Sequence, residues 1–323
     1  MAPYVVAFPD VMTPRVNAEI ARVAPAEFSV RFVAGADAAT LADADFMLGG
    51  IAPITAAMIR AAPRLRLIQK WGIGVDKIDL QAARDAGVPV AITFGANAAP
   101  VAEHALALML AVFRRLPYVD RNLRAGRWVR AEMREVCYQL AGRTVGLLGF
   151  GNVARMLAQR LRGFEVRILY TDIRPADAAS ETALHARRVP FDELMREADV
   201  LSVHLPLTAA TRGLIGAAAM AAMKSEAVII NTSRGGIVDE TALCEALREG
   251  RLLGAGLDVF DTEPLAADHP LLALDNVVLS PHTAGSVFDN VAQQARHAFA
   301  NMQAVLRGEP LAPVDVVVPA RAD

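Results

Sequence analysis

The stretch from Arg143 to Asp172 constrains the fold of this chain more than any other part of its sequence. It reads RTVGLLGFGNVARMLAQRLRGFEVRILYTD: an apolar run, a glycine turn, a segment with helical periodicity, and a second apolar run that ends in an acid. This order predicts a strand, a turn, a helix and a strand. Gly149, Gly151 and Ala154 fit the pattern G-x-G-x-x-G/A. The first glycine of this pattern permits the tight turn, the second lets a pyrophosphate approach the backbone, and a small third residue lets helix and strand pack closely.

The helix after this turn suits a dinucleotide. It is expected to open at Asn152 and Val153, so that its unpaired N–H groups and its dipole face the phosphates. Asp172 ends the second strand 23 residues after Gly149, close to where an acid would bind the ribose hydroxyls. Its charge would repel a 2′-phosphate, so we expect NAD in preference to NADP. Arg174, two residues on, could soften that preference.

Length and composition limit the class of protein. A chain of 323 residues with 54% hydrophobic residues is expected to form two domains with a large core. A formal net charge of −2 without a long basic run gives no footprint for nucleic acid or an anionic membrane. Cys137 and Cys244 form no CxxC or metal spacing, which favours a reduced, cytoplasmic setting and no metal site. The first residues lack a basic region and a long apolar segment, which predicts a strand and not a signal peptide.

Short apolar runs recur along the chain. Those at 4–8, 29–33, 46–48, 65–69 and 88–93 are separated by helix-like segments, which predicts parallel strands with crossover helices in a small α/β unit. Further strands are expected at 200–203, 228–230, 253–259 and 277–279, making a six-stranded doubly wound sheet with the two around the glycine turn. The polar stretch with His185, Arg187 and Arg188 is expected to be a solvated surface. A last helix is expected from Ser286 to about Arg307, after which the tail PLAPVDVVVP should return to the first unit.

One apolar segment lies between the two units. Residues from Val101 to about Ala125 are rich in alanine and leucine, which predicts a long helix that Pro117 kinks or splits. A long apolar helix outside either sheet would pack across the domain joint or against another subunit. We expect both, and therefore a homodimer.

Three predicted strands are followed by residues that suit one reaction. Arg234 lies in NTSRGG, Glu263 in FDTEP and His282 in SPHTAG, all at the sheet edge where ligands of open parallel sheets bind. Hydride transfer to a carbonyl needs a proton donor and a cation near the oxygen. A histidine can donate the proton, a neighbouring carboxylate orients it, and an arginine can bind a substrate carboxylate in a planar fork. Singly, each residue could be a helix partner, an exposed turn residue or a structural histidine. Together they favour an active site.

The sequence resembles the D-isomer-specific 2-hydroxyacid dehydrogenases. Nearly the whole chain takes part in this resemblance, and the ordered Arg, Glu, His series is specific to it. The matching segments are VGLLGFGNVA from Val145, VHLPLTAATRGLI from Val203, NTSRGGIVDETAL from Asn231, GAGLDVFDTEP from Gly254, SPHTAG from Ser280, KWGIGVDKID from Lys70 and NAAPVAEHALALML from Asn97.

The resemblance implies roles for these residues. Arg234 would bind substrate, Glu263 would orient His282, and His282 would be the acid/base. Backbone N–H groups at Ile73 and Gly74 would bind the substrate carboxylate. Cofactor contacts are implied at the glycine turn and at His204, Pro206, Thr211, Thr232, Asp258 and Gly285.

Other positions near these motifs leave alternatives open. Asp76, next to the substrate loop, is expected to cap the following helix. Lys70 could meet a phosphate or carboxylate at the far end of the substrate, as phosphoglycerate-oxidising relatives imply, or form a salt bridge at the rim. The family often has a serine where this chain has Pro100, which could stiffen the hinge. The formate-oxidising branch has glutamine where this chain has Glu263, so that branch is disfavoured.

We therefore predict an α/β protein of two domains, with a Rossmann doubly wound parallel sheet inserted into a smaller flavodoxin-like α/β domain. The substrate-binding domain would span 1–98 and be completed by 286–323, and the NAD-binding domain would span 99–285. The expected function is NAD-dependent hydride transfer between NADH and a small 2-oxo acid of the glyoxylate, hydroxypyruvate or 3-phosphoglycerate class. Alternatives are an NAD(H)-sensing corepressor-like adaptor and a phosphite dehydrogenase. No regulatory domain is expected after residue 323.

Overall fold

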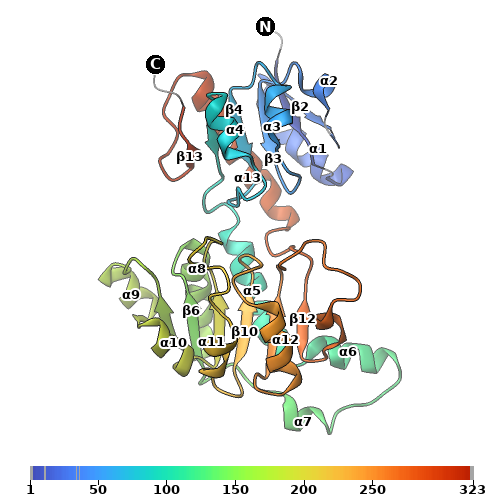
Figure 1. Ribbon diagram of the computed structural model, residues 1–323, viewed down its shortest axis with the longest axis vertical. Helices are drawn as coiled ribbons and strands as arrows, with labels where there is room; N and C mark the ends of the chain where they lie inside the picture. Colours follow the sequence, from blue (N-terminus) through green and yellow to red (C-terminus); the bar gives the residue numbers. More distant parts are fainter. Residues whose placement is uncertain (1–2, 11, 34, 36, 321–323) are drawn as a thin grey trace. The chain divides into compact units, whose positions relative to one another are not determined.

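The computed structural model describes residues 3–10, 12–33, 35 and 37–320. The chain forms two compact units, unit 1 (Met1–Asn97 with Val287–Asp323) and unit 2 (Ala98–Ser286). Each unit is an α/β structure built around one sheet (Figure 1).

Unit 1 has six strands in its described part, in the order β13-β5-β4-β3-β1-β2. Neighbouring strands are parallel except β13, which runs antiparallel to β5. Helices α1 and α13 pack on one face, and α3 and α4 pack on the other. The strands are β1 (Tyr4–Phe8), β2 (Phe28–Phe32), β3 (Phe46–Gly49), β4 (Leu67–Lys70), β5 (Val90–Ala91) and β13 (Val316–Val318). The helices are α1 (Pro14–Val23), α2 (Ala38–Leu41), α3 (Ala56–Arg60), α4 (Leu80–Asp85) and α13 (Val291–Leu306).

The end of the chain folds back onto unit 1 as the sequence predicted, although its last helix begins later than expected. The pairing of β13 with β5 confirms that the tail returns to unit 1. Helix α13 begins at Val291 and not at Ser286, because a short 3₁₀ turn precedes it.

Asp76 does not cap α4. The cap is Asp79, whose carboxylate accepts the Ala82 N–H at 2.9 Å, since the chain still pairs with another loop at Ile78 before it turns into the helix.

Unit 2 has a fully parallel sheet of seven strands in the order β12-β11-β10-β9-β6-β7-β8, counted over the described residues. The sequence of β6, α8 and β7 around the glycine turn is as predicted. The strands are β6 (Thr144–Leu148), β7 (Arg167–Thr171), β8 (Ala186–Arg188), β9 (Val200–Val203), β10 (Val228–Asn231), β11 (Gly254–Leu257) and β12 (Val277–Leu279). The helices are α5 (Ala98–Phe113), α6 (Leu116–Arg124), α7 (Met133–Val136), α8 (Asn152–Leu161), α9 (Ala178–Leu184), α10 (Phe191–Glu197), α11 (Ala217–Ala221) and α12 (Glu240–Arg248).

The prediction of six strands missed the edge strand β8. The segment with Arg187 and Arg188 pairs in parallel with β7, although both arginines are exposed. Ala186 alone is buried there. A three-residue edge strand with one apolar residue has no apolar run, so its sequence looks like a solvated surface.

The expectation that the long helix lies outside either sheet was wrong. Helix α5 packs on the sheet of unit 2, in one core with β6, β9 and β10. Glycines of β11 permit this close approach: a Cβ on Gly254 would lie 2.7 Å from Val112 Cγ1, and one on Gly256 would lie 2.9 Å from Leu108 Cβ. The predicted split near Pro117 is confirmed, because Arg115 adopts a left-handed backbone (φ 49°) between α5 and α6.

Candidate functional site

The glycine turn after β6 leaves room for a phosphate group. Gly149 has φ 90°, and a Cβ there would lie 2.8 Å from the carbonyl oxygen of His204, so glycine is required. A Cβ on Gly151 would meet nothing within 4 Å. Helix α8 begins at Asn152 without a side-chain cap. Its first N–H groups therefore suit an anion.

Asp172 at the end of β7 supports this turn. Its Oδ2 accepts the Phe150 N–H at 2.7 Å, and its Oδ1 accepts the Arg174 N–H at 3.0 Å. Each oxygen keeps a second lone pair that can accept from a hydroxyl. Asp172 thus lies where the sequence predicted a ribose-binding acid, and it also fixes the turn.

Two polar atoms at neighbouring strand ends fit a polar ligand. The pairing of Val203 with Asn231 places His204 beside Thr232. Among the described residues, neither His204 Nε2 nor Thr232 Oγ1 has a hydrogen-bond partner, and both atoms are buried. Burial lowers the pKa of His204 to about 4, so the ring is neutral at pH 7. Buried polar atoms without partners cost about 1–3 kcal/mol each, a cost that a bound amide or hydroxyl group would remove.

The loop after β9 contains two more predicted cofactor residues. Thr211 Oγ1 donates to the Pro206 carbonyl at 2.7 Å, and this hydrogen bond joins the two ends of the loop. The Thr208 N–H in turn donates to Thr211 Oγ1 at 2.8 Å. The Thr211 hydroxyl therefore shapes the loop.

The predicted trio follows three adjacent strands, β10, β11 and β12. His282 Nδ1 lies 2.8 Å from Glu263 Oε2 and 3.1 Å from Oε1. Glu263 is held in turn by the Phe260 N–H, which donates to Oε1 at 3.2 Å. The His282 side chain is 45% exposed, so a small molecule can reach it.

The loop with Arg234 packs directly on the loop that leads to Glu263. A Cβ on Gly235 would lie 1.9 Å from the Phe260 carbonyl oxygen, so only glycine fits. The Gly236 N–H donates to Asp261 Oδ1 at 2.5 Å. Arg234 Nη1 donates to the Ser233 carbonyl at 2.6 Å, and Asn231 Nδ2 donates to the Arg234 carbonyl at 2.8 Å. The contacts of Gly235 and Gly236 bring the loops of Arg234 and Glu263 together, and those of Arg234 and Asn231 fix the shape of the first loop.

Asp258, predicted as a cofactor contact, is buried and holds the turn of His282. Its Oδ1 accepts the Thr283 N–H at 2.8 Å, and its Oδ2 accepts the Ala284 N–H at 2.9 Å. The His282 N–H donates to the Asp258 carbonyl at 2.7 Å. Gly285, the next predicted residue, follows directly in this turn. Sequence reasoning missed the anchoring role, because it depends on contacts between strand ends.

Unit 1 has its own set of predicted residues at strand ends. Lys70 ends β4, and its Nζ donates to the Gly50 carbonyl. Ile73 and Gly74 follow in a loop whose preceding Gly72 N–H donates to Thr93 Oγ1 at 2.8 Å.

Sequence reasoning missed Asp10, which lies just after β1. Its carboxylate accepts the N–H groups of Gly50, Ile51 and Ala52 at 2.6–2.7 Å. A Cβ on Gly50 would lie 2.6 Å from Asp10 Oδ2. The signal was available, since an acid directly after a strand at the ligand-binding edge is the kind of position that identified the trio.

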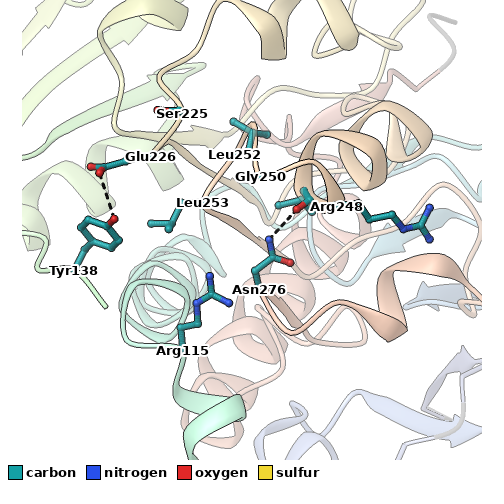
Figure 2. A pocket seen from close by; sticks show the side chains of 10 residues that line it. Arg115, Tyr138, Ser225, Glu226, Arg248, Gly250, Leu252, Leu253 and Asn276 are labelled. Atoms are coloured by element: carbon teal, nitrogen blue, oxygen red, sulfur yellow. Dashed lines mark hydrogen bonds between the residues drawn. The ribbon is translucent and has the colours of Figure 1, made fainter. Parts of the chain in front are cut away.

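A hollow of about 450 Å³ lies at the opposite edge of unit 2, before β10, β11 and β12 begin (Figure 2). Tyr138 there donates to Glu226 Oε1 at 3.2 Å, and Asn276 donates to the Leu247 carbonyl at 3.3 Å. None of the trio lines it, so this hollow is not the candidate site. Its lining residues are Arg115, Tyr138, Ser225, Glu226, Leu247, Arg248, Gly250, Leu252, Leu253 and Asn276.

The described residues show neither a metal-binding cluster nor a membrane-spanning helix. They hold no group of three or more histidine, cysteine, aspartate or glutamate side chains arranged to bind a metal ion. None of the helices in the described part of the chain has both the length and the apolar character needed to cross a membrane.

Comparison with known proteins identifies the family of the chain. Residues 106–284 match the family described as D-isomer specific 2-hydroxyacid dehydrogenase, NAD binding domain. The chain is 42% identical over 260 residues to a glyoxylate reductase of Korarchaeum cryptofilum, covering 80% of this chain and 78% of that protein. It is 41% identical over 235 residues to a hydroxypyruvate reductase of Thermotoga maritima, covering 72% and 75%. The solved NADPH-dependent glyoxylate/hydroxypyruvate reductase of Sinorhizobium meliloti, in complex with citrate, has a TM-score of 0.82, 30% identity and 97% coverage of both chains.

Proposed function

The chain belongs to the D-isomer specific 2-hydroxyacid dehydrogenase family and is an NAD-dependent oxidoreductase of 2-oxo acids, and we propose that Arg234, Glu263 and His282 carry its hydride transfer. The observation that supports this assignment is the pair of His282 Nδ1 and Glu263 Oε2 at 2.8 Å. The pair follows β11 and β12, and β11 is adjacent to β10, the strand that precedes Arg234. The proposed substrate is a small 2-oxo acid of the glyoxylate or hydroxypyruvate class.

Each member of the trio has one task in this proposal. Bound NADH would supply a hydride to the carbonyl carbon, which would leave negative charge on the carbonyl oxygen. His282 donates a proton to that oxygen from Nε2, because Glu263 occupies Nδ1. Arg234 binds the substrate carboxylate and stabilises the charge on the oxygen. In the oxidation of the 2-hydroxy acid, His282 accepts the proton instead.

We assign the cofactor to the carboxyl edge of unit 2. The N–H groups at the start of α8 suit the pyrophosphate, and Asp172 suits the ribose. The unpartnered atoms of His204 and Thr232 suit polar groups of the nucleotide. The complete proposed set is Gly149, Gly151, Asn152, Val153, Asp172, His204, Pro206, Thr211, Thr232, Asp258 and Gly285.

We assign substrate contacts in unit 1 to Lys70, Ile73 and Gly74. Backbone N–H groups of the loop with Ile73 and Gly74 would bind the substrate carboxylate. The Lys70 ammonium adds positive charge at the same sheet edge while it donates to the Gly50 carbonyl. Asp10 would set the position of the loop that begins at Gly50, since its carboxylate accepts three N–H groups of that loop.

Steady-state kinetics across 2-oxo acids that differ in size and terminal charge test the function. We expect NADH oxidation with glyoxylate and hydroxypyruvate, and a selective loss of kcat/KM for substrates with a terminal anion in Lys70→Ala. Lys77→Ala, at an exposed lysine, is the matched control. Folded protein that is inactive with every 2-oxo acid would refute the proposal, and turnover of phosphite alone would replace it.

We also propose a homodimer formed through the arm, defined as residues 116–136. Figure 1 shows this segment extending away from the sheet of unit 2. It exposes Leu116 (58%), Leu123 (56%) and Trp128 (78%), an apolar content that favours burial against a second copy. Sedimentation should give a dimer for the wild type and a monomer for Trp128→Glu. A monomeric wild type would contradict this.

We place the protein in the cytoplasm, because Cys137 and Cys244 form no disulfide and a reducing compartment suits both thiols. Activity should then be unchanged by added reductant. Activation of the isolated protein by an oxidant would argue against this placement.

A further inference from the structure

A chain of short contacts leads from α5 to the turn of His282. His104, on α5, has its Nε2 2.8 Å from Ser280 Oγ. Ser280 Oγ lies 2.6 Å from Asp258 Oδ1. Asp258 is buried, whereas the His104 side chain is 26% exposed. The direct distance from His104 Nε2 to Asp258 Oδ1 is 3.6 Å, so the serine hydroxyl joins the two.

The chemistry of these groups fixes where the protons lie. A serine hydroxyl has one proton, and at 2.6 Å from a carboxylate oxygen it donates that proton to Asp258. Ser280 Oγ must then accept from His104, so His104 Nε2 carries a proton. This order also separates the cluster from a hydrolytic triad, in which the histidine lies between serine and acid and accepts the serine proton.

Asp258 in turn holds the backbone next to His282, the proposed acid/base. Its two carboxylate oxygens hold the N–H groups of Thr283 and Ala284, the two residues after His282. His282 itself has φ 54°, a left-handed conformation that costs on the order of 1–3 kcal/mol for a residue other than glycine. The turn keeps this conformation only while Asp258 keeps its orientation, and the Ser280 hydroxyl supplies one of its contacts.

We propose that His104 is a positioning residue for His282, acting through the Ser280 hydroxyl and the Asp258 carboxylate. The proposal rests on the acid/base role of His282 proposed above. His104 touches neither substrate nor cofactor in this scheme. It fixes the serine proton on Asp258, and Asp258 fixes the backbone turn from which the His282 ring reaches the substrate.

Kinetics of three variants test this role. His104→Leu removes the donor, His104→Gln restores one, and Ser280→Ala interrupts the chain at its centre. We expect His104→Leu and Ser280→Ala to lower kcat about 10- to 100-fold, since small misplacement of a reacting group has effects of this order. KM for NADH should stay within about twofold of the wild type. His104→Gln should recover most of kcat. Glu103→Gln, at the exposed neighbouring residue of α5, is the matched control and should match the wild type.

Equal kcat for His104→Leu and the wild type would overturn the proposal, and so would equal losses for the Leu and Gln variants. Wild type and His282→Ala are assayed in parallel, so failure of the reaction itself is seen separately as an inactive wild type. A readout without turnover is the nitrogen NMR spectrum of the six histidine rings. It should place the His104 proton on Nε2 and show a shifted His282 signal in Ser280→Ala. A His104 ring protonated only on Nδ1 would reverse the hydrogen-bond order and refute the chain.

Discussion

His282 Nδ1 lies 2.8 Å from Glu263 Oε2, although the two residues are 19 positions apart and follow different strands. The contact orients the imidazole, because the carboxylate occupies Nδ1 and leaves Nε2 for the substrate. It therefore joins the two residues into one functional unit, on which the proposed reduction depends.

Glu263→Gln should lower kcat about 100-fold, because the amide can donate to Nδ1 and so favour the wrong tautomer of the ring. Binding of NADH, followed by fluorescence titration, should be unchanged. The control is Glu226→Gln, at a glutamate in the hollow at the opposite edge of the sheet. Equal loss in both variants would mean that the effect is not specific to the histidine pair.

Arg234→Lys should lower kcat/KM for 2-oxo acids about 100-fold, which is about 2.7 kcal/mol, mainly through a higher KM. Lysine keeps the charge but cannot form the two parallel hydrogen bonds of a guanidinium with a carboxylate. Arg248→Lys, in the hollow, is the control. An unchanged KM in Arg234→Lys would remove Arg234 from the substrate site.

Asp10→Asn should raise KM for the 2-oxo acid about tenfold and leave NADH binding intact. The amide can accept with one oxygen only, so the loop at Gly50 loses charge-assisted contacts worth about 1.5–3 kcal/mol each at most. Steady-state kinetics measures the change in KM, and chemical unfolding measures the stability lost with these contacts. Asp43→Asn, at an exposed ion pair with Arg31, should change neither.

His204 makes stability depend on pH. Its folded-state pKa is about 4, below an unfolded value of about 6.5. Between these values the unfolded state takes up the proton first, so stability is complete above about pH 6.5 and falls as the pH falls toward 4. The loss reaches about 3 kcal/mol at its limit. Urea unfolding measures the free energy of unfolding of wild type and His204→Gln. As the pH falls from 6.5 to 4.5, the wild type should lose more of this free energy than the variant. Parallel pH curves would contradict a neutral, buried His204.

The sequence predicted those parts of the fold that depend on local pattern. The apolar runs around Gly149 and the residues after β10, β11 and β12 could be read directly, because strand ends of a parallel sheet share one edge. Helix α5 could not be placed, since its packing depends on Gly254 and Gly256, about 150 residues away. The edge strand β8 has too few apolar residues to be recognised.

Within the site, the identities of Arg234, Glu263 and His282 were predictable, and their supports were not. The resemblance implied only a cofactor contact for Asp258, and its carboxylate also holds the turn of His282. Its partner His104 lies on a helix far away in sequence. Such contacts arise only from tertiary packing, which leaves no periodic signal in the sequence.

A single-turnover experiment on His282→Ala tests the role of His282 most directly. Enzyme with bound NADH is mixed with glyoxylate or hydroxypyruvate, and the loss of NADH absorbance is followed. We predict that the variant binds NADH as the wild type does and transfers hydride about 10²- to 10⁴-fold more slowly. Transfer at the wild-type rate in the variant would contradict the acid/base role of His282.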